Sequence, residues 1–212
     1  MDGWQLTSAG YHRIEEAVGS YVCRVRRVNG RFAMIAVPQG GGVMKVLLSS
    51  DQIQARILEM GKQLAADYAG GEPHLVGVLK GACPFMTDLA QAIDLPLTLD
   101  YIAVSSYGKA TKSSGEVKLV KDLDQGLEGR DLLVVEDIVD TGLTLNYLVN
   151  LLKARGPRSL KVVALLSKPA RRLVEVHVDY VGFTIEDEFV VGYGLDYNER
   201  YRNLRDIVVY GG

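Results

Sequence analysis

The chain has little of what several classes of protein depend on. Among its 212 residues are only two cysteines, Cys23 and Cys83, which are too few for a disulfide framework and favour a reducing compartment. No apolar run approaches the roughly 20 residues that a membrane span requires. The N-terminus also lacks the basic-then-apolar pattern of a signal peptide. We therefore expect a cytoplasmic protein with no membrane partner.

The chain also has few histidines and a small net charge. His12, His74 and His177 are scattered without the spacing of a zinc site, and we expect each at the surface or at the edge of an element. The formal net charge is only −2, which argues against a nucleic-acid partner. The apolar fraction of 48% is that of an ordinary globular protein, and the length suits one α/β domain with a substantial core.

From about Val46 onward, helical and strand patterns alternate. Ser49 and Gln52 can form a capping box ahead of an apolar stripe, and Gly70-Gly71 ends that helix. Strands alternating with helices predict βαβ units and an α/β fold with a mostly parallel sheet. The expected helices span residues 49–71, 84–93 and 143–156, and the expected strands span 74–81, 95–107, 131–137, 159–168 and 206–210.

Residues 1–43 fit this alternation poorly. The stretch YVCRVRRVNGRFAMIAV indicates a hairpin that turns at Asn29-Gly30, and PQGGGVM has the composition of a linker. We expect residues 1–43 to be a dispensable N-terminal extension, with Met44 as a candidate natural start. Residues 44–212 would then form the functional domain.

The stretch LLVVEDIVDTGLTL, from Leu132 to Leu145, is the most informative part of the sequence. Its apolar run is typical of a strand buried on both faces, and ligands of open α/β sheets bind at the carboxyl ends of such strands. Glu136 and Asp137 are expected at that end. The following Asp-Thr-Gly turn leads into a helix, whose N-terminal N–H groups suit a phosphate. The stretch therefore suits a sugar phosphate, with a diol over the acids and the phosphate in the turn.

Other phosphate-handling motifs are missing. The sequence contains no G-x-x-x-x-G-K-[ST] loop, and GYGLDY lacks the third glycine of a dinucleotide-binding turn. Paired acids after a strand also suggest a haloacid-type phosphatase. That class needs D-x-D-x-[TV], which EDIVDTG does not supply.

The motif VVEDIVDTGLTL resembles the phosphoribosyl-diphosphate (PRPP) site of type I phosphoribosyltransferases. Together with VGVLKGACPF, SSYG, LLSKP and FVVGYGLDYNERYRNL, it makes residues 45–212 similar to the hypoxanthine and hypoxanthine-guanine phosphoribosyltransferases. The resemblance implies a mostly parallel central sheet flanked by helices, with a small hood subdomain. It also implies purine salvage, in which PRPP and hypoxanthine or guanine give IMP or GMP and diphosphate. Magnesium (Mg2+) would be required, and the family usually forms homodimers or homotetramers.

The resemblance also implies residue roles around PRPP. Glu136 and Asp137 match the acids that hold the ribose hydroxyls and contribute to magnesium binding. Asp140 matches the acid near N7 of the purine, the expected general base. Arg202 matches a diphosphate ligand. The loop around the 5′-phosphate would comprise Asp140, Thr141, Gly142, Leu143 and Thr144. The diphosphate loop would contain Lys80 and Gly81, and in this family it carries a non-proline cis peptide.

On the purine side, the resemblance assigns Lys168 to the purine O6, which as an acceptor selects oxopurines over adenine. Phe189 would stack on the base, and Val190 would offer backbone groups to its edge. Asp196 would lie at the purine site and meet a second magnesium. Taken alone, Lys168 could instead be a solvated strand end and Phe189 plain core, and Arg202 could lie on a solvated face.

A polar loop lies between two of the expected strands. The polar loop SSYGKATKSSGEVK is expected to be a lid, in which Ser106 and Tyr107 close over the reacting centre and exclude water.

Cys83 lies beside the diphosphate loop but is expected to be structural. An RNA-binding pyrimidine-attenuation regulator of the same fold remains an alternative, which would require a basic face and different base contacts.

Overall fold

The computed structural model describes residues 12–18, 21–28, 31–38, 44–106 and 117–211; the side chains of residues 12–38, Ser106 and Val117 lie outside this description. The chain divides into two units, residues 1–45 with 209–212 and residues 46–208, which are described separately. In the described part of the chain, no helix combines the length and the apolar character needed to cross a membrane.

The N-terminal unit contains an antiparallel sheet of three strands, β1 (His12–Val18), β2 (Tyr21–Val28) and β3 (Arg31–Pro38). Strands β2 and β3 pair from Tyr21↔Pro38 to Val28↔Arg31, which confirms the predicted hairpin. Its two turn residues and the predicted linker at 39–43 lie outside the described residues.

The larger unit is built around a sheet of six strands in the order β10-β9-β8-β5-β6-β7. All neighbours are parallel except β7, which runs antiparallel to β6, so the predicted α/β fold is confirmed. The strands are β5 (His74–Leu79), β6 (Thr98–Ser106), β7 (Val117–Lys121), β8 (Asp131–Val139), β9 (Ser159–Ser167) and β10 (Tyr180–Thr184).

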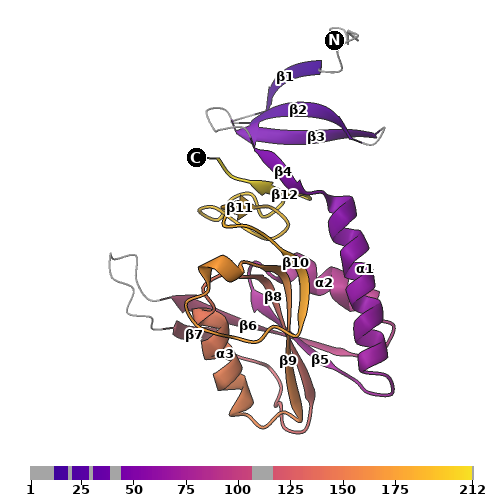
Figure 1. Ribbon diagram of the computed structural model, residues 1–212, viewed down its shortest axis with the longest axis vertical. Coiled ribbons are helices and arrows are strands. Elements are labelled where there is room, and N and C mark those ends of the chain that lie inside the picture. The colour runs from indigo at the N-terminus through magenta and orange to yellow at the C-terminus, as the bar shows by residue number, and fades with distance from the viewer. Residues whose placement is uncertain (1–11, 19–20, 29–30, 39–43, 107–116, 212) are drawn as a thin grey trace. The chain divides into compact units, whose positions relative to one another are not determined.

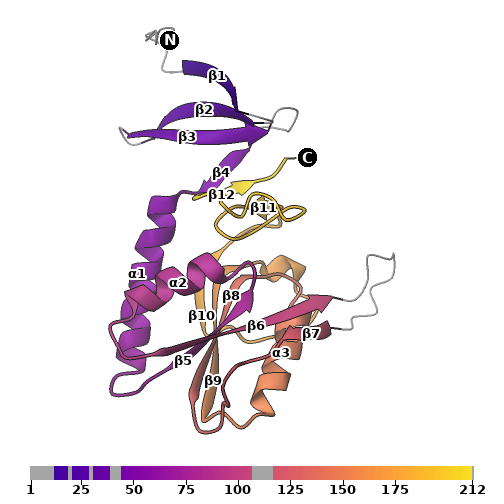
Figure 2. The same ribbon diagram turned by 180° about the vertical axis from the view of Figure 1, so that it is seen from behind.

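Helices cover both faces of this sheet. In Figure 1 and, from behind, in Figure 2, α1 (Ser50–Asp67) and α2 (Cys83–Ala92) lie together on one face, and α3 (Leu143–Lys153) lies on the other. Strand alternation explains the division, because Leu132 and Val134 of β8 pack in one cluster with Leu145 and Leu148 of α3. The four residues Leu132 to Val135 are all fully buried, as the apolar run predicts.

Helix α1 begins as its sequence predicts but ends at Asp67, three residues before the Gly70-Gly71 pair that was expected to end it. The Ser49 hydroxyl accepts a hydrogen bond from the Gln52 N–H at 3.3 Å, and the Gln52 side chain accepts one from the Ser49 N–H at 2.9 Å. The stripe of Ile53, Ile57, Met60 and Leu64 is buried. Each such side chain stabilises the fold by roughly 1.5–3 kcal/mol relative to exposure.

The expectation for the histidines is wrong at His74. This residue begins the central strand β5 and is fully buried, with Nδ1 2.7 Å from the Thr98 hydroxyl. Burial lowers the pKa of His74, and the neighbouring Arg130 lowers it further. The Thr98 hydroxyl thus pairs with Nδ1, whereas the buried Nε2 has no hydrogen-bond partner among the described residues. The side chain of His177 is 84% exposed, as expected.

A second small sheet has the order β11-β12-β4, formed by β11 (Val190–Val191), β12 (Ile207–Val209) and β4 (Lys45–Leu48). Strand β12 confirms the last predicted strand. Residues 192–206, between β11 and β12, carry several of the residues expected to bind substrate. The short 3-10 helix η1 (Pro169–Arg171) follows β9 after one residue, Lys168.

Candidate active site

Glu136 and Asp137 lie within β8 and not after it, which corrects the predicted end of this strand at residue 137. The ladder with β9 continues through Ile138↔Leu166 to Val139↔Ser167, so pairing with the neighbouring strand extends β8 by two residues. Because successive strand residues face opposite sides, the two carboxyl groups belong to opposite faces near the carboxyl edge of the sheet.

Both acids are costly to ionise where they lie. Burial raises the pKa of Glu136 well above its ordinary value, and the neighbouring Asp137 raises it further. Burial also raises the pKa of Asp137 to about 6, although the Ile138 N–H donates to its carboxylate and Arg202 lies nearby. The negative charge of Asp196 also raises the pKa of Asp137. A bound cation would relieve this cost, because it would stabilise the charged form.

Three chain segments meet closely at Asp137. A Cβ atom at Gly81 would overlap the Asp137 carboxylate, and one at Gly194 would overlap the Gly81 carbonyl. The sequence positions of these glycines therefore allow the loop after β5, strand β8 and the segment after β11 to converge. The Leu79–Lys80 peptide in this loop is cis, as the family resemblance implies.

The expected phosphate loop links β8 to α3. Gly142 caps the helix with φ of 83°, a conformation that favours glycine, and a Cβ there would lie 2.6 Å from the Val174 carbonyl oxygen. The Thr141 carbonyl accepts hydrogen bonds from the N–H groups of Leu173 and Val174 at 2.9 and 3.2 Å. The segment after η1 thus holds the loop in place. The N-terminal amides of α3, beginning at Leu143 and Thr144, follow directly, where an anion is favoured.

Two arginines that the sequence analysis missed hold Asp140. Arg172 donates to the Asp140 carbonyl at 2.9 Å and to the Ser167 hydroxyl at 3.0 Å. Arg171 Nε lies 2.9 Å from Asp140 Oδ1 as an ion pair, although that oxygen accepts no aligned hydrogen bond. Arg171 also donates to Asp187 at 3.3 Å. The pair Arg171-Arg172, just after Lys168-Pro169, was the sequence feature that could have predicted these contacts with Asp140.

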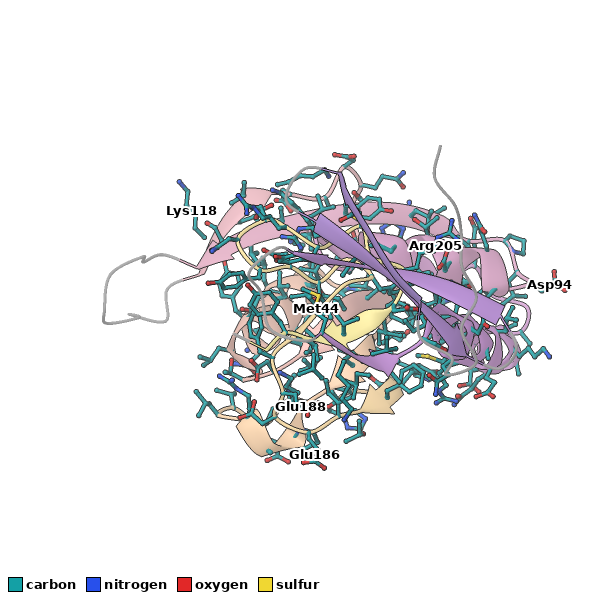
Figure 3. The ribbon with its side chains drawn as sticks, turned by 90° about the horizontal axis from the view of Figure 1, so that it is seen from above. Met44, Asp94, Lys118, Glu186, Glu188 and Arg205 are labelled. Carbon is teal, nitrogen blue, oxygen red and sulfur yellow. The ribbon has the colours of Figure 1, made fainter. Side chains whose placement is uncertain are left out.

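Lys168 is brought beside this loop and is only 4% exposed, which rules out a solvated strand end. Its backbone N–H donates to the Val139 carbonyl at 3.0 Å, directly before Asp140. Its Nζ donates to the Glu188 carbonyl at 2.6 Å. Glu188 and Glu186 lie together in the turn between β10 and β11 (Figure 3), where the Glu188 N–H donates to the Glu186 carbonyl.

Phe189 follows Glu188 and is 51% exposed, so it is not plain core. Its ring meets the edge of Tyr197 with centroids 5.9 Å apart and an interplanar angle of 87°. Val190 is buried in β11. The segment thus presents an aromatic face next to the turn that holds the Lys168 ammonium group.

Arg202 is the centre of a charged network and does not lie on a solvated face. Its Nη1 donates to the Gly194 carbonyl at 2.7 Å, and its Nη2 lies 2.8 Å from Asp196 Oδ1. Glu199 was missed because it lies in the charge-rich run NERYRNLRD. Its carboxylate accepts from Lys80 Nζ at 2.9 Å and from Arg202 Nη2 at 3.4 Å. Lys80 and Arg202, expected at one diphosphate group, are therefore joined by one acid.

The remaining site predictions have different outcomes. Ser106 ends β6, but its side chain and Tyr107 lie outside the described residues, so the predicted lid stays a prediction. Cys83 is a free, partly buried thiol at the start of α2, and burial raises its pKa. A raised thiol pKa disfavours the nucleophilic thiolate, in agreement with a structural role.

The donor atoms fit a magnesium ion that shares its ligands with a substrate. Within the described ranges, no three His, Cys, Asp or Glu side chains form a ready-made metal cluster. Asp137 and Asp196 are nevertheless close enough for one to raise the pKa of the other. Mg2+ prefers oxygen ligands and is commonly held by one or two carboxylates together with substrate phosphates.

Comparisons with known proteins point in one direction. The family model described as the phosphoribosyl transferase domain matches residues 46–198. The hypoxanthine-guanine phosphoribosyltransferase of Bacillus subtilis is 54% identical over 162 residues, covering 76% of this chain and 90% of that protein. The bifunctional protein TilS/HprT of Listeria monocytogenes is 59% identical over 162 residues, and the match spans only 25% of its length.

Solved structures agree with these sequence matches. A hypoxanthine phosphoribosyltransferase from Staphylococcus aureus superposes with a TM-score of 0.76 at 48% identity, covering 79% of this chain and 91% of that chain. The similar proteins favour a transferase over the RNA-binding regulator and the phosphatase.

Proposed function

The chain belongs to the phosphoribosyltransferase family, and from this premise we propose that it transfers the phosphoribosyl group of PRPP to hypoxanthine and to guanine. The products are IMP or GMP and diphosphate, so the reaction salvages purine bases. The match to named hypoxanthine-guanine phosphoribosyltransferases supports this assignment. The family model matches residues 46–198, which lie within the larger unit. This unit contains every site residue discussed above.

One observation carries the proposal within the site itself. The Lys168 N–H donates to the Val139 carbonyl at 3.0 Å, which brings the residue expected to select the base next to Asp140, the residue expected to accept its proton. The buried Lys168 ammonium group donates one hydrogen bond to the Glu188 carbonyl, and its remaining N–H donors can pair with O6 of an oxopurine. Adenine carries a donor at that position and would leave these remaining N–H groups without an acceptor.

The reaction makes separate demands on the sugar side of the site. As the bond from C1 of the ribose to the diphosphate breaks, positive charge develops on the sugar and negative charge on the leaving group. Lys80 and Arg202 would stabilise the leaving diphosphate, while the N–H groups at the start of α3 would hold the 5′-phosphate. Glu136 and Asp137 would accept hydrogen bonds from the ribose hydroxyls.

On the purine side, Asp140 would accept a proton as the base attacks C1 of the ribose. Arg171 pairs with the carboxylate of Asp140 and Arg172 donates to its carbonyl, so that the orientation of Asp140 is set before the substrates bind. Phe189 would cover one face of the base. Such preorganisation lowers the cost of reaching the transition state.

Magnesium would be held by Asp137 and Asp196, with Glu136 close by, and it would neutralise part of the diphosphate charge when bound. We propose a homodimer or homotetramer as the assembled form. Because PRPP and the nucleotide products carry several charges, they do not cross apolar membranes readily, and we place the reaction in the cytoplasm.

The test is PRPP-dependent nucleotide formation with Mg2+ and four bases, namely hypoxanthine, guanine, xanthine and adenine. We expect IMP and GMP to form and AMP not to form. Omission of PRPP provides the blank, and Asp140→Asn provides the protein control. Formation of AMP at a rate comparable to IMP would refute the oxopurine assignment, and release of phosphate from simple esters would instead favour the phosphatase.

A further inference from the structure

Glu199 occupies an unusual place in the charged network. One of its carboxylate oxygens lies 2.9 Å from Lys80 Nζ, and the other lies 3.4 Å from Arg202 Nη2. Lys80 and Glu199 are 119 residues apart in the chain, so the contact exists only because the loop after β5 meets the segment after β11. A single internal anion therefore bridges the two cations that we assign to the diphosphate group.

The backbone that presents Glu199 adopts a conformation that ordinary residues avoid. Asn198, Glu199 and Tyr201 have φ values of 51°, 63° and 75°, in the left-handed region where a Cβ atom is unfavourable. The Asp196 carboxylate accepts a hydrogen bond from the Glu199 N–H at 2.8 Å and stabilises this turn. Left-handed residues of this kind are concentrated at functional sites, where the surrounding structure maintains them.

We propose that Glu199 is an internal competitor of diphosphate, and this inference rests on the proposed function. In the free enzyme its carboxylate pairs with Lys80 at 2.9 Å and with Arg202 at 3.4 Å, although Asp196 lies closer to Arg202 at 2.8 Å. The diphosphate group of PRPP must displace Glu199 from both cations. After the transfer, the same carboxylate competes again for both cations and favours the release of diphosphate. Glu199 is thus a residue that sets the affinity of the site for its anionic ligand.

The exposure of the network suits such an exchange. The side chains of Lys80 and Glu199 are 67% and 64% exposed, and an ion pair in water contributes little because the solvent screens it. A diphosphate carries several negative charges where Glu199 carries one. The ligand can therefore replace the carboxylate at small cost, yet the carboxylate is close enough to return once the ligand leaves.

The competing explanation is that Glu199 merely positions the two cations for the ligand. The two explanations predict opposite signs for Glu199→Gln, which keeps the shape and removes the charge. As a competitor, its loss should tighten the binding of diphosphate and of PRPP by about two- to tenfold, the range for one exposed ion pair with Lys80 and one longer pair with the less exposed Arg202. As a positioning group, its loss should weaken both.

The experiment is calorimetric titration of the full chain with sodium diphosphate and, separately, with PRPP, both with Mg2+ and without a purine base. Glu128→Gln is the matched control, because Glu128 is an exposed acid between β7 and β8 whose loss changes the net charge equally. We expect tighter binding for Glu199→Gln and wild-type binding for Glu128→Gln. Unchanged or weaker binding by Glu199→Gln would overturn the proposal.

A second comparison tests whether the gain in binding depends on Lys80. In a Lys80→Met background, the gain from Glu199→Gln should shrink, because one of the two released cations is missing; an equal gain in both backgrounds would contradict the proposal. Wild-type protein that binds neither PRPP nor diphosphate would instead refute the proposed function. Wild-type protein that binds both, without any gain in Glu199→Gln, would refute only this inference.

Discussion

Asp137→Asn should make the magnesium-free protein more stable while it weakens substrate binding. Burial raises the pKa of Asp137 from 3.8 to about 6, so the folded protein holds this proton more tightly than the unfolded chain does. Between these two values the folded state binds more protons. The free energy of unfolding therefore falls as the pH rises through this window, and the loss is complete above about pH 6.

The magnitude follows from the same pKa values. At about 1.4 kcal/mol per pKa unit, the charged Asp137 costs up to about 3 kcal/mol at pH 7.5. An asparagine retains an oxygen that can accept the hydrogen bond from the Ile138 N–H, which is 2.8 Å long in the structure. The variant should therefore avoid most of the electrostatic cost without losing this contact.

Urea unfolding in EDTA measures the effect directly. At pH 7.5 the midpoint of Asp137→Asn should exceed that of the wild type. Near pH 4 most of this difference should be lost, because Asp137 is then neutral in the folded state. Asp94→Asn, at an exposed position, is the control for loss of one negative charge. PRPP with Mg2+ should stabilise the wild type more than the variant. A variant less stable than the wild type at pH 7.5 in EDTA would refute the reasoning.

Three further predictions address the base, the proton and the N-terminal extension. Lys168→Gln should weaken oxopurine binding by about 1.5–3 kcal/mol, the contribution of a charged hydrogen bond, and should leave PRPP binding almost unchanged. Equal losses of affinity for both substrates in equilibrium titrations would show that Lys168 does not lie in the base pocket. Asp140→Asn should lower the single-turnover rate by about 10²–10⁴-fold, and a wild-type rate at every pH would exclude it as the base. Removal of residues 1–43 should leave turnover and Tm almost unchanged, whereas failure of the truncated chain to fold would show that the extension packs on the domain.

Local signals accounted for most of the elements of the fold. The capping box at Ser49 and the apolar stripe of α1 act within one helix, so their effect can be seen from spacing alone. The buried run of β8 and its acids likewise predicted a strand that delivers polar groups to one edge of the sheet. The hairpin of β2 and β3 followed from Asn29-Gly30 between two strand-forming runs.

The failures concern contacts between distant parts of the chain. His74 was expected at a surface or an edge, but its burial depends on the position of β5 between β8 and β6 and on Thr98 as a partner. The length of β8 was underestimated because its last residues are ordered by pairing with β9. Neither fact has a signature within a short window of sequence.

Periodicity, capping and motif spacing are local properties of the chain, so the sequence alone predicted the class of the fold, the starts of the helices and the residue types of the site. The predicted ends of α1 and α3 ran past the observed ends at Asp67 and Lys153. Only the tertiary structure decided which charges meet. It places Arg171 against Asp140 and Glu199 between Lys80 and Arg202. Coulomb interactions fall with distance and with exposure to water, so the charge balance of the site depends on how separate loops converge.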